Sequence, residues 1–316
     1  MGKRGVSLFI KLVFLIFLSS CSLIKPNLRV SQLNYCAPQS SYSYDSTYIP
    51  LNDINSFLIS DKTSLKKYSY RDLLLANASG SFFLLQDLIH LQEAKTIDDD
   101  SLIYIMVKKQ QIFNRLLLAS TELASLAAEL DCESERSKQS ANYLDQINDT
   151  RIQRLTILSV ITGAATAIIT SVSNSHKTQV AVGVNGSIIS GVFAGLAVFS
   201  SRKSIVVAHN RNLLADIWYA PKISTTYPPF IWFVLNAKEF NIGGNTSTIL
   251  SLKDRWVEEG LIDSSKKSKK ELLFFGKGGK YLANDLHTLT SMINQLKAEI
   301  RSINQDLQSL MLKLSV

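Results

Sequence analysis

Leucine and isoleucine recur in alternating steps of four and three residues through the last segment of the chain, from Leu282 to Leu314. Such a repeat places one apolar stripe along a helix and is typical of a coiled-coil seam. The flanking positions, Thr290 and Lys297 among them, form no clear charge code. We therefore expect residues 281–316 to form one helix that packs antiparallel against a long helix of the same chain, with homodimerisation as the alternative.

A second long helix is expected from about Asp99 to past Thr170. Proline is absent from residues 51–220 and glycine from residues 81–162, and these two residues are the strongest helix breakers. At 1.5 Å per residue the helix would be roughly 100 Å long. The predicted fold class is all-α: an elongated antiparallel long-helix bundle or coiled coil, with an apolar helical hairpin and a small irregular head.

The predicted hairpin consists of two uncharged stretches, residues 155–175 and 178–201, joined by a short polar connector. Each stretch is long enough to cross the hydrocarbon layer of a bilayer, which takes about 20 helical residues. Small residues at every fourth position would form a smooth stripe on each arm and let two helices approach closely. We expect these residues to serve membrane insertion or helix packing: Ser159, Gly163, Ala167 and Ser171 in the first arm, and Gly183, Ser187, Gly191 and Gly195 in the second.

Three interpretations of the hairpin at 155–201 remain open. It inserts into a membrane, it is buried inside a soluble helical bundle, or it forms part of an aqueous pore. The threonines, serines and Asn185 inside the arms favour the buried hairpin. Its flanks, with Arg151 and Arg154, are also more basic than its tip. In an exported protein this charge distribution runs against the usual cytoplasmic bias of positive residues.

Shorter elements are predicted elsewhere. One helix is expected over Arg71–Glu93, bent at Gly80, and another over Thr246–Glu259. Phe230–Leu235 is consistent with a short strand or a buried helical turn, Leu272–Phe275 with a small strand, and Gly276–Lys280 with a turn that enters the last helix. The predicted organisation is a signal peptide at 1–20, a lipidated tether at 21–50, a long-helix region at 51–218, an irregular head at 219–280 and the heptad helix at 281–316.

The first residues have the plan of a secretory signal. Three cations accompany a short apolar run that ends at Leu18, and two serines and Cys21 follow. Leucine three places before a cysteine resembles the lipobox of bacterial lipoproteins. That resemblance implies cleavage before Cys21 and acylation of its thiol, as with palmitate. We expect a protein of the bacterial cell envelope, anchored by lipid in the outer or inner membrane and facing the periplasm or the exterior.

Export changes how charge and cysteine content are interpreted. Without residues 1–20 the chain has 31 basic and 26 acidic residues, a dispersed net charge of +5 that suits anionic headgroups. No basic stripe interleaved with aromatics is present, which argues against a nucleic-acid partner. Cys36 and Cys132 are the remaining thiols, and an oxidising compartment favours a disulfide between them over two buried free thiols.

The sequence contains no recognisable catalytic motif. Its four histidines are widely spaced, and neither a zinc-binding pattern, nor a P-loop, nor a Gly-x-Ser-x-Gly elbow occurs. We expect a non-enzymatic lipoprotein without metal or cofactor, whose hairpin engages a membrane or a partner helix. The alternatives are a pore-forming protein and an envelope hydrolase assembled from distant residues. Expected partners are membrane lipid, through the acyl chains of Cys21 and through the hairpin, and a protein partner or second copy through the helices.

Several segments resemble an uncharacterised group of bacterial lipoproteins. They are LDCESER before the hairpin, RLTILSVITGAATAI at its start, PPFIWFVLN and RWVEEG in the middle, and FFGKGGKYLANDL before the terminal heptads. The resemblance covers most of residues 100–310 and implies no activity. The plan of long helices beside an apolar hairpin is also similar to that of helical pore-forming toxins, as an analogy of architecture alone.

Overall fold

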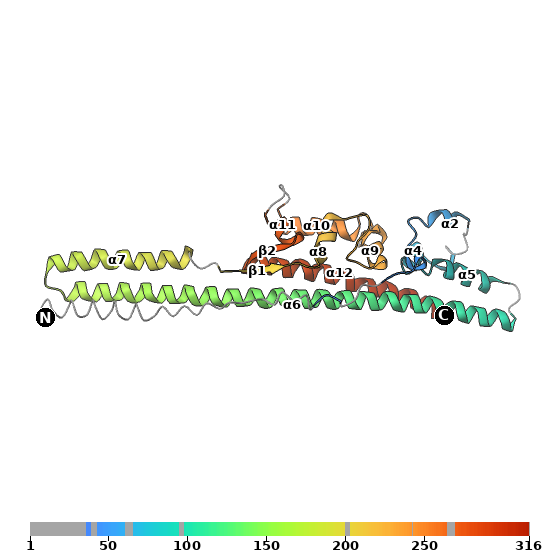
Figure 1. The fold of residues 1–316 in the computed structure, drawn as a ribbon, viewed down its shortest axis with the longest axis horizontal. Coiled ribbons are helices and arrows are strands. Elements are labelled where there is room, and N and C mark those ends of the chain that lie inside the picture. Colours follow the sequence, from blue (N-terminus) through green and yellow to red (C-terminus); the bar gives the residue numbers. More distant parts are fainter. Residues whose placement is uncertain are drawn as a thin grey trace. The chain divides into compact units, whose positions relative to one another are not determined.

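The computed structural model describes residues 36–38, 43–60, 66–94, 98–199, 203–241, 243–263 and 269–315, all within the unit Gln32–Val316. The predicted signal peptide, Cys21 and much of the predicted tether lie outside these residues. The all-α class with long antiparallel helices is confirmed (Figure 1). The elements are η1 (Ser46–Tyr48), α2 (Asn55–Ser60), α4 (Tyr70–Ala78), α5 (Phe82–Glu93), α6 (Asp99–Val172), α7 (His176–Phe199), β1 (Ser204–Ala208), α8 (Leu213–Tyr219), α9 (Pro229–Asn236), η2 (Lys238–Phe240), α10 (Thr248–Glu258), α11 (Lys269–Phe275), β2 (Gly278–Leu282) and α12 (Ala283–Ser315).

Helix α6 is uninterrupted over 74 residues, as the absence of helix breakers predicts. Its first turn is capped by Asp98, whose carboxylate accepts a hydrogen bond from the backbone amide of Ser101 at 2.9 Å. Asp99 and Asp100 add negative charge where the helix dipole is positive. At 1.5 Å per residue, α6 is about 110 Å long, and it contacts helices α5, α7, α9 and α12.

Helix α12 packs antiparallel along α6, which confirms the intrachain prediction (Figure 1). The direction follows from paired side chains: Ser134 donates to Asn294 at 2.8 Å, while Ser120 lies nearer the start of α6 and pairs with Asn304. Burial of each leucine or isoleucine of the seam contributes about 1.5–3 kcal/mol before entropy is counted. The seam residues that are at most 5% exposed are Leu286, Leu289, Ile293, Leu296, Ile300, Ile303, Leu307, Leu310 and Leu314.

The predicted single helix at 71–93 is two helices, α4 and α5. Gly80 separates them with a positive φ of +70°, a conformation that side chains other than hydrogen disfavour. A Cβ atom there would also collide with the carbonyl oxygen of Thr47 and the guanidinium of Arg115. Gly80 is therefore a break at a close approach between segments, rather than a bend within one helix.

The region predicted as an irregular head contains several short helices. Thr248–Glu258 is helical and is followed by Gly260, as expected, and Phe230–Leu235 belongs to helix α9. The small strand predicted at Leu272–Phe275 is wrong, because these residues end helix α11. Phe275 stacks on Trp218 of α8 and on Trp256 of α10, whose ring is fully buried. The apolar run therefore fills a core between helices instead of pairing in a sheet.

The predicted turn at Gly276–Lys280 is only partly right, because Gly276 and Lys277 form a bend while Gly278–Lys280 begin strand β2. Strand β2 pairs antiparallel with β1, from Ser204 opposite Leu282 to Ala208 opposite Gly278. Gly278 has a φ of +88°, and a Cβ atom there would collide with the carbonyl of Val207. The strand pair ties the end of the hairpin directly to the start of α12.

Candidate functional site

The last turns of α6 and the whole of α7 form the apolar hairpin (Figure 1). Both helices contain stretches that are long and apolar enough to cross a membrane. Helix α7 has 24 residues and is therefore about 36 Å long, a little more than the ~30 Å hydrocarbon core of a bilayer. The rest of the chain covers little of these stretches: none of the most apolar 18-residue window of α6 is buried, and 11% of that of α7.

The two arms touch through serine, threonine and glycine residues. Ser159 and Ser190 form reciprocal hydrogen bonds, each hydroxyl donating to the backbone carbonyl of the other residue at 3.0 Å. Gly186, which is buried, lies directly against the side chain of Thr166. A Cβ atom on Gly183 would be 3.6 Å from the Thr170 methyl group. The arms are therefore joined by close backbone approach and by hydrogen bonds, which suit a medium that offers no hydrophobic effect.

The eight predicted small residues have different surroundings. Ser159, Gly163 and Gly183 lie where the arms meet, and a Cβ atom on Gly163 would be 3.6 Å from the Ser190 hydroxyl. No atom lies within 4 Å of a Cβ built on Gly191 or Gly195, so the GxxxG sequence does not pack against α6. The remaining members of the set, Ala167, Ser171 and Ser187, are exposed.

Gly186 was not among the predicted residues, although it makes the tightest contact between the arms. It follows Gly183 by three residues and precedes Ser190 by four. A pattern of alternating three- and four-residue steps includes Gly186, whereas the predicted spacing of exactly four residues does not.

The polar side chains inside the arms form hydrogen bonds within their own helix. The hydroxyl of Thr162 donates to the carbonyl of Leu158 at 2.7 Å, and the Asn185 amide donates to the carbonyl of Ala181 at 2.8 Å. Such bonds to the preceding turn let Ser, Thr and Asn face an apolar medium without unsatisfied donors. The same arrangement occurs at Thr166, Thr170, Ser171 and Ser187.

Large aliphatic side chains cover the outer faces of both arms and are exposed. Their exposed fractions range from 43% to 75%. Monomeric soluble proteins rarely expose a contiguous apolar surface of such length, and one that does usually binds a membrane or a partner there. These residues, which we call the hairpin face, are Ile157, Val160, Ile161, Ile168 and Val172 of α6, and Val180, Val184, Ile188, Ile189, Val192, Leu196 and Val198 of α7.

An open groove of about 560 Å³ lies between the arms. Unlike the hairpin face, it is lined by small and hydroxyl-bearing residues. The lining consists of Gly163, Thr166, Ala167, Thr170, Gly183, Ser187, Ser190 and Gly191. The hairpin thus has an aliphatic outer surface and a more polar inner one.

A second feature fixes the N-terminal part of the described chain to α6. A disulfide joins Cys36 to Cys132, with their Cα atoms 5.5 Å apart. Farther along, Arg115 donates to the carbonyl oxygens of Thr47 and Gly80, both at 2.6 Å, and its guanidinium lies 4.4 Å from the centre of the Tyr48 ring. The last residues of the segment predicted as a tether at 21–50 are therefore held on the body of the protein, Thr47 and Tyr48 by α6 and Leu51 by Asn77 of α4.

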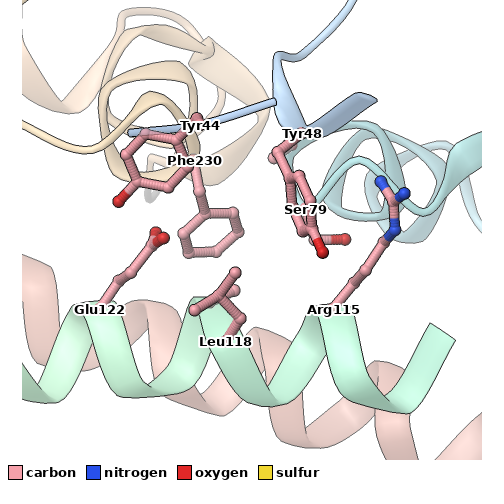
Figure 2. A pocket seen from close by; sticks show the side chains of 9 residues that line it. Tyr44, Tyr48, Ser79, Arg115, Leu118, Glu122 and Phe230 are labelled. Atoms are coloured by element: carbon pink, nitrogen blue, oxygen red, sulfur yellow. The ribbon is translucent and has the colours of Figure 1, made fainter. Parts of the chain in front are cut away.

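Figure 2 shows the small pocket that these contacts enclose, with Tyr44 directed toward Glu122 and Tyr48 beside Arg115. Burial raises the pKa of Glu122, and a hydrogen bond from Tyr44 partly opposes that effect. The cavity of about 10 Å³ has room for about one water molecule. It is too small for an organic substrate. We therefore interpret this pocket as part of the contacts that hold the N-terminal segment on α6.

A cluster of charged side chains joins α6 to the head. Arg211 donates to the buried carboxylate of Glu129 at 2.8 Å and to the carbonyl oxygen of Thr226 at 2.5 Å. Burial raises the pKa of Glu129, and the charge of Arg211 opposes this shift. Glu133 pairs with Arg136 one turn later. These ion pairs give the buried and half-buried charges of α6 between Glu129 and Arg136 a partner of opposite sign.

His209 lies in the same region, at the end of β1. Its Nε2 atom is 2.7 Å from the hydroxyl of Tyr281, which itself donates to the carbonyl of Leu273 at 2.5 Å. Because the hydroxyl has one proton, His209 donates from Nε2. Burial, together with the positive charge of Arg136, lowers the pKa of His209 to about 4. The imidazole is therefore neutral at pH 7 and has a structural role between the two strands.

Within the described ranges, no group of three or more His, Cys, Asp or Glu side chains is arranged to hold a metal ion. No protein-family model matches the chain, and no match is found among curated proteins or among solved structures.

Proposed function

We propose that this chain is a non-enzymatic lipoprotein of the bacterial cell envelope, whose hairpin inserts into a membrane. The observation that carries the proposal is the hairpin face, a surface of exposed aliphatic side chains on two antiparallel helices of membrane-spanning length. A membrane would remove this surface from water, at a gain of about 25 cal/mol per Å² of apolar area.

The polar content of the arms is compatible with this proposal. In hydrocarbon an unsatisfied donor costs several kcal/mol, which would exclude a hairpin rich in serine and threonine whose hydroxyls had no acceptor. Here Thr162, Thr166, Thr170 and Asn185 each donate to a carbonyl of their own helix. The side chains that favoured a buried hairpin in the sequence are thus also suited to lipid.

The location in the envelope is supported by two independent features. The segment that ends at Cys21 resembles a lipobox, and the disulfide between Cys36 and Cys132 suits an oxidising compartment. Acyl chains on Cys21 would give one point of attachment. An inserted hairpin would add a second attachment beside those acyl chains.

The test uses fractionation of cells that produce the Cys21→Ala variant, which cannot be acylated. We expect this variant to stay in the membrane pellet after carbonate extraction, because the hairpin alone holds it there. Adding Ile161→Arg and Ile188→Arg should release it, since each charge at mid-membrane depth costs about 2.5–3.5 kcal/mol. Release of Cys21→Ala by itself would refute hairpin insertion.

A matched control places the same charge outside the hairpin. Ile223 is 82% exposed and lies between α8 and α9 in the head. Cys21→Ala combined with Ile223→Arg should stay in the pellet. Separately, metabolic labelling with a fatty acid should mark the wild-type protein and not the Cys21→Ala variant, which tests the lipid anchor independently of the hairpin.

A second candidate function, membrane permeabilisation, is favoured by the groove between the arms. If several hairpins assembled with their grooves facing inward, hydroxyls such as those of Thr166 and Ser190 would line a polar path. Wild-type protein should then release dye from liposomes. Gly191→Leu and Gly195→Leu, which place bulk where the structure leaves space, should abolish the release while the protein remains membrane-bound. Intact dye retention by the bound wild-type protein would exclude this function.

A further inference from the structure

We propose that the hairpin inserts into the same bilayer that holds the acyl chains of Cys21, and that the Cys36–Cys132 disulfide sets the distance between the two attachments. This inference rests on the proposed function and adds which membrane the hairpin enters and from which side. It follows from the course of the N-terminal segment, from distances along α6 and from the charges at the base of the hairpin.

The N-terminal segment runs along α6 in a defined direction. Tyr44 is directed toward Glu122 (Figure 2). Cys36 is bonded to Cys132, and the carbonyl oxygen of Thr47 accepts a hydrogen bond from Arg115. Increasing residue numbers in this segment thus correspond to decreasing numbers along α6. Of Cys36, Tyr44 and Thr47, Cys36 therefore contacts α6 nearest to the hairpin end of the long helix.

The lengths allow the acyl anchor to reach the base of the hairpin. Arg154, the last charged residue of α6 before the apolar arm, lies 22 residues beyond Cys132, about 33 Å along the helix. The 15 residue steps from Cys21 to Cys36 span at most about 54 Å. Val172, at the tip end of α6, is about 60 Å from Cys132 and is out of reach. The anchor can therefore share the leaflet at the base of an inserted hairpin, but not the leaflet at its tip.

The charges agree with this orientation. Arg151, Arg154 and Lys203 lie at the base of the hairpin, and Arg154 and Lys203 are exposed. A basic side chain near an anionic leaflet contributes about 1 kcal/mol to membrane binding. The tip has Lys177 and His176, so fewer cations have to cross than remain at the base. The base of the hairpin thus fits the headgroups of the leaflet that holds the acyl chains.

The test uses the full mature lipidated protein in liposomes that contain an anionic lipid and a photoactivatable phospholipid, mixed with a second population of unlabelled liposomes. After illumination, trypsin cleaves at Arg154, Lys177 and Arg202 and releases the two arms as separate peptides. We expect the photoactivatable lipid to be attached to both peptides. In the reciprocal mixture, in which only the second population contains the photoactivatable lipid, labelling should be at least tenfold lower.

The outcomes separate the two proposals. Labelling by the second population, together with bridging of liposomes in light scattering, would overturn the shared-bilayer inference and leave hairpin insertion intact. Absence of labelling from either population would overturn both. Labelling by the carrying population alone supports both.

Changing the number of residues between Cys21 and Cys36 tests whether the disulfide sets the distance between the two membrane attachments. Deletion of residues 24–33 leaves four residues between Cys21 and Cys36, so the two cysteines can be at most about 18 Å apart along the chain, less than the ~33 Å to the hairpin base. Labelling of both arms should fall at least fivefold. Replacing the same ten residues with a Gly-Ser sequence keeps the length and should preserve labelling. Equal labelling of the deletion and replacement variants would refute the inference that the disulfide sets the distance between the two attachments.

Discussion

Gly186 of α7 lies directly against the side chain of Thr166 of α6, and a Cβ atom at position 186 would overlap three of its atoms. This contact fixes how closely the arms of the hairpin approach. Gly186→Ala should force the arms apart and destabilise their packing by about 1–3 kcal/mol. Hydrogen-exchange mass spectrometry of the detergent-solubilised protein should show faster amide exchange in residues 176–198.

The control for that substitution is Gly191→Ala in the same helix. No atom lies within 4 Å of a Cβ at this position, and alanine favours a helix over glycine by about 1 kcal/mol. Exchange in Gly191→Ala should therefore be unchanged or slower. Equal acceleration in both variants would contradict the assigned contact.

The hairpin illustrates what the sequence can predict about a site. Two uncharged stretches and a short connector were enough to predict antiparallel arms, because the length and polarity of a segment are local properties. Of the residues predicted to serve membrane insertion or helix packing, Gly163 and Gly183 touch the other arm, whereas no atom lies within 4 Å of a Cβ on Gly191 or Gly195. Which row of small residues faces the partner depends on the rotation of each helix, which a periodic pattern leaves undetermined.

The same distinction holds for the fold. Helices α6 and α12 follow from helix propensity and heptad spacing, both of which act between residues a few positions apart. The pairing of Ser204–Ala208 with Gly278–Leu282 joins segments about 70 residues apart, and two glycines at the start of β2 resemble a turn. The apolar residues Leu272–Phe275 suit a strand or a helix equally, and only their packing against Trp218 and Trp256 decides between them.

The disulfide closes a loop with a sequence separation of 96 residues, so its loss should strongly destabilise the fold. In the loop-entropy model the oxidised form is more stable by about 4–5 kcal/mol. Urea denaturation monitored by tryptophan fluorescence should show this difference between oxidised and reduced protein. Cys36→Ser should behave like the reduced protein and lose all sensitivity to reductant. A reductant-sensitive midpoint in Cys36→Ser would refute the pairing.

His209 should make the stability of the head depend on pH. Burial and the charge of Arg136 lower the pKa of His209 from about 6.5 to about 4, so the folded state holds this imidazole neutral. The stability that it contributes is present above pH 6.5 and is lost as the pH falls from 6.5 to about 4. The loss amounts to at most about 3 kcal/mol. Urea denaturation at several pH values between 4 and 7, followed by fluorescence of the buried Trp256, measures it.

His209→Gln retains a donor toward Tyr281 but does not titrate, so its stability should fall less on acidification than that of the wild type. The buried carboxyls of Glu122, Glu129 and Glu133 have raised pKa values and change stability in the opposite direction, but equally in both proteins. The difference between the two profiles therefore isolates the histidine. Parallel profiles from pH 7 to pH 4 would contradict its neutral burial.

Arg115 holds the N-terminal segment on α6, so Arg115→Met should release that segment without unfolding the helix. The substitution removes hydrogen bonds to Thr47 and Gly80 and the contact with the Tyr48 ring, at a cost of about 2–3 kcal/mol. Chymotrypsin cleavage after Tyr48 should accelerate roughly 30- to 150-fold. Lys138→Met removes a charge from an exposed position of the same helix and should leave cleavage unchanged. If the Arg115 variant is cleaved no faster than the Lys138 variant, residues 43–51 are held by other contacts.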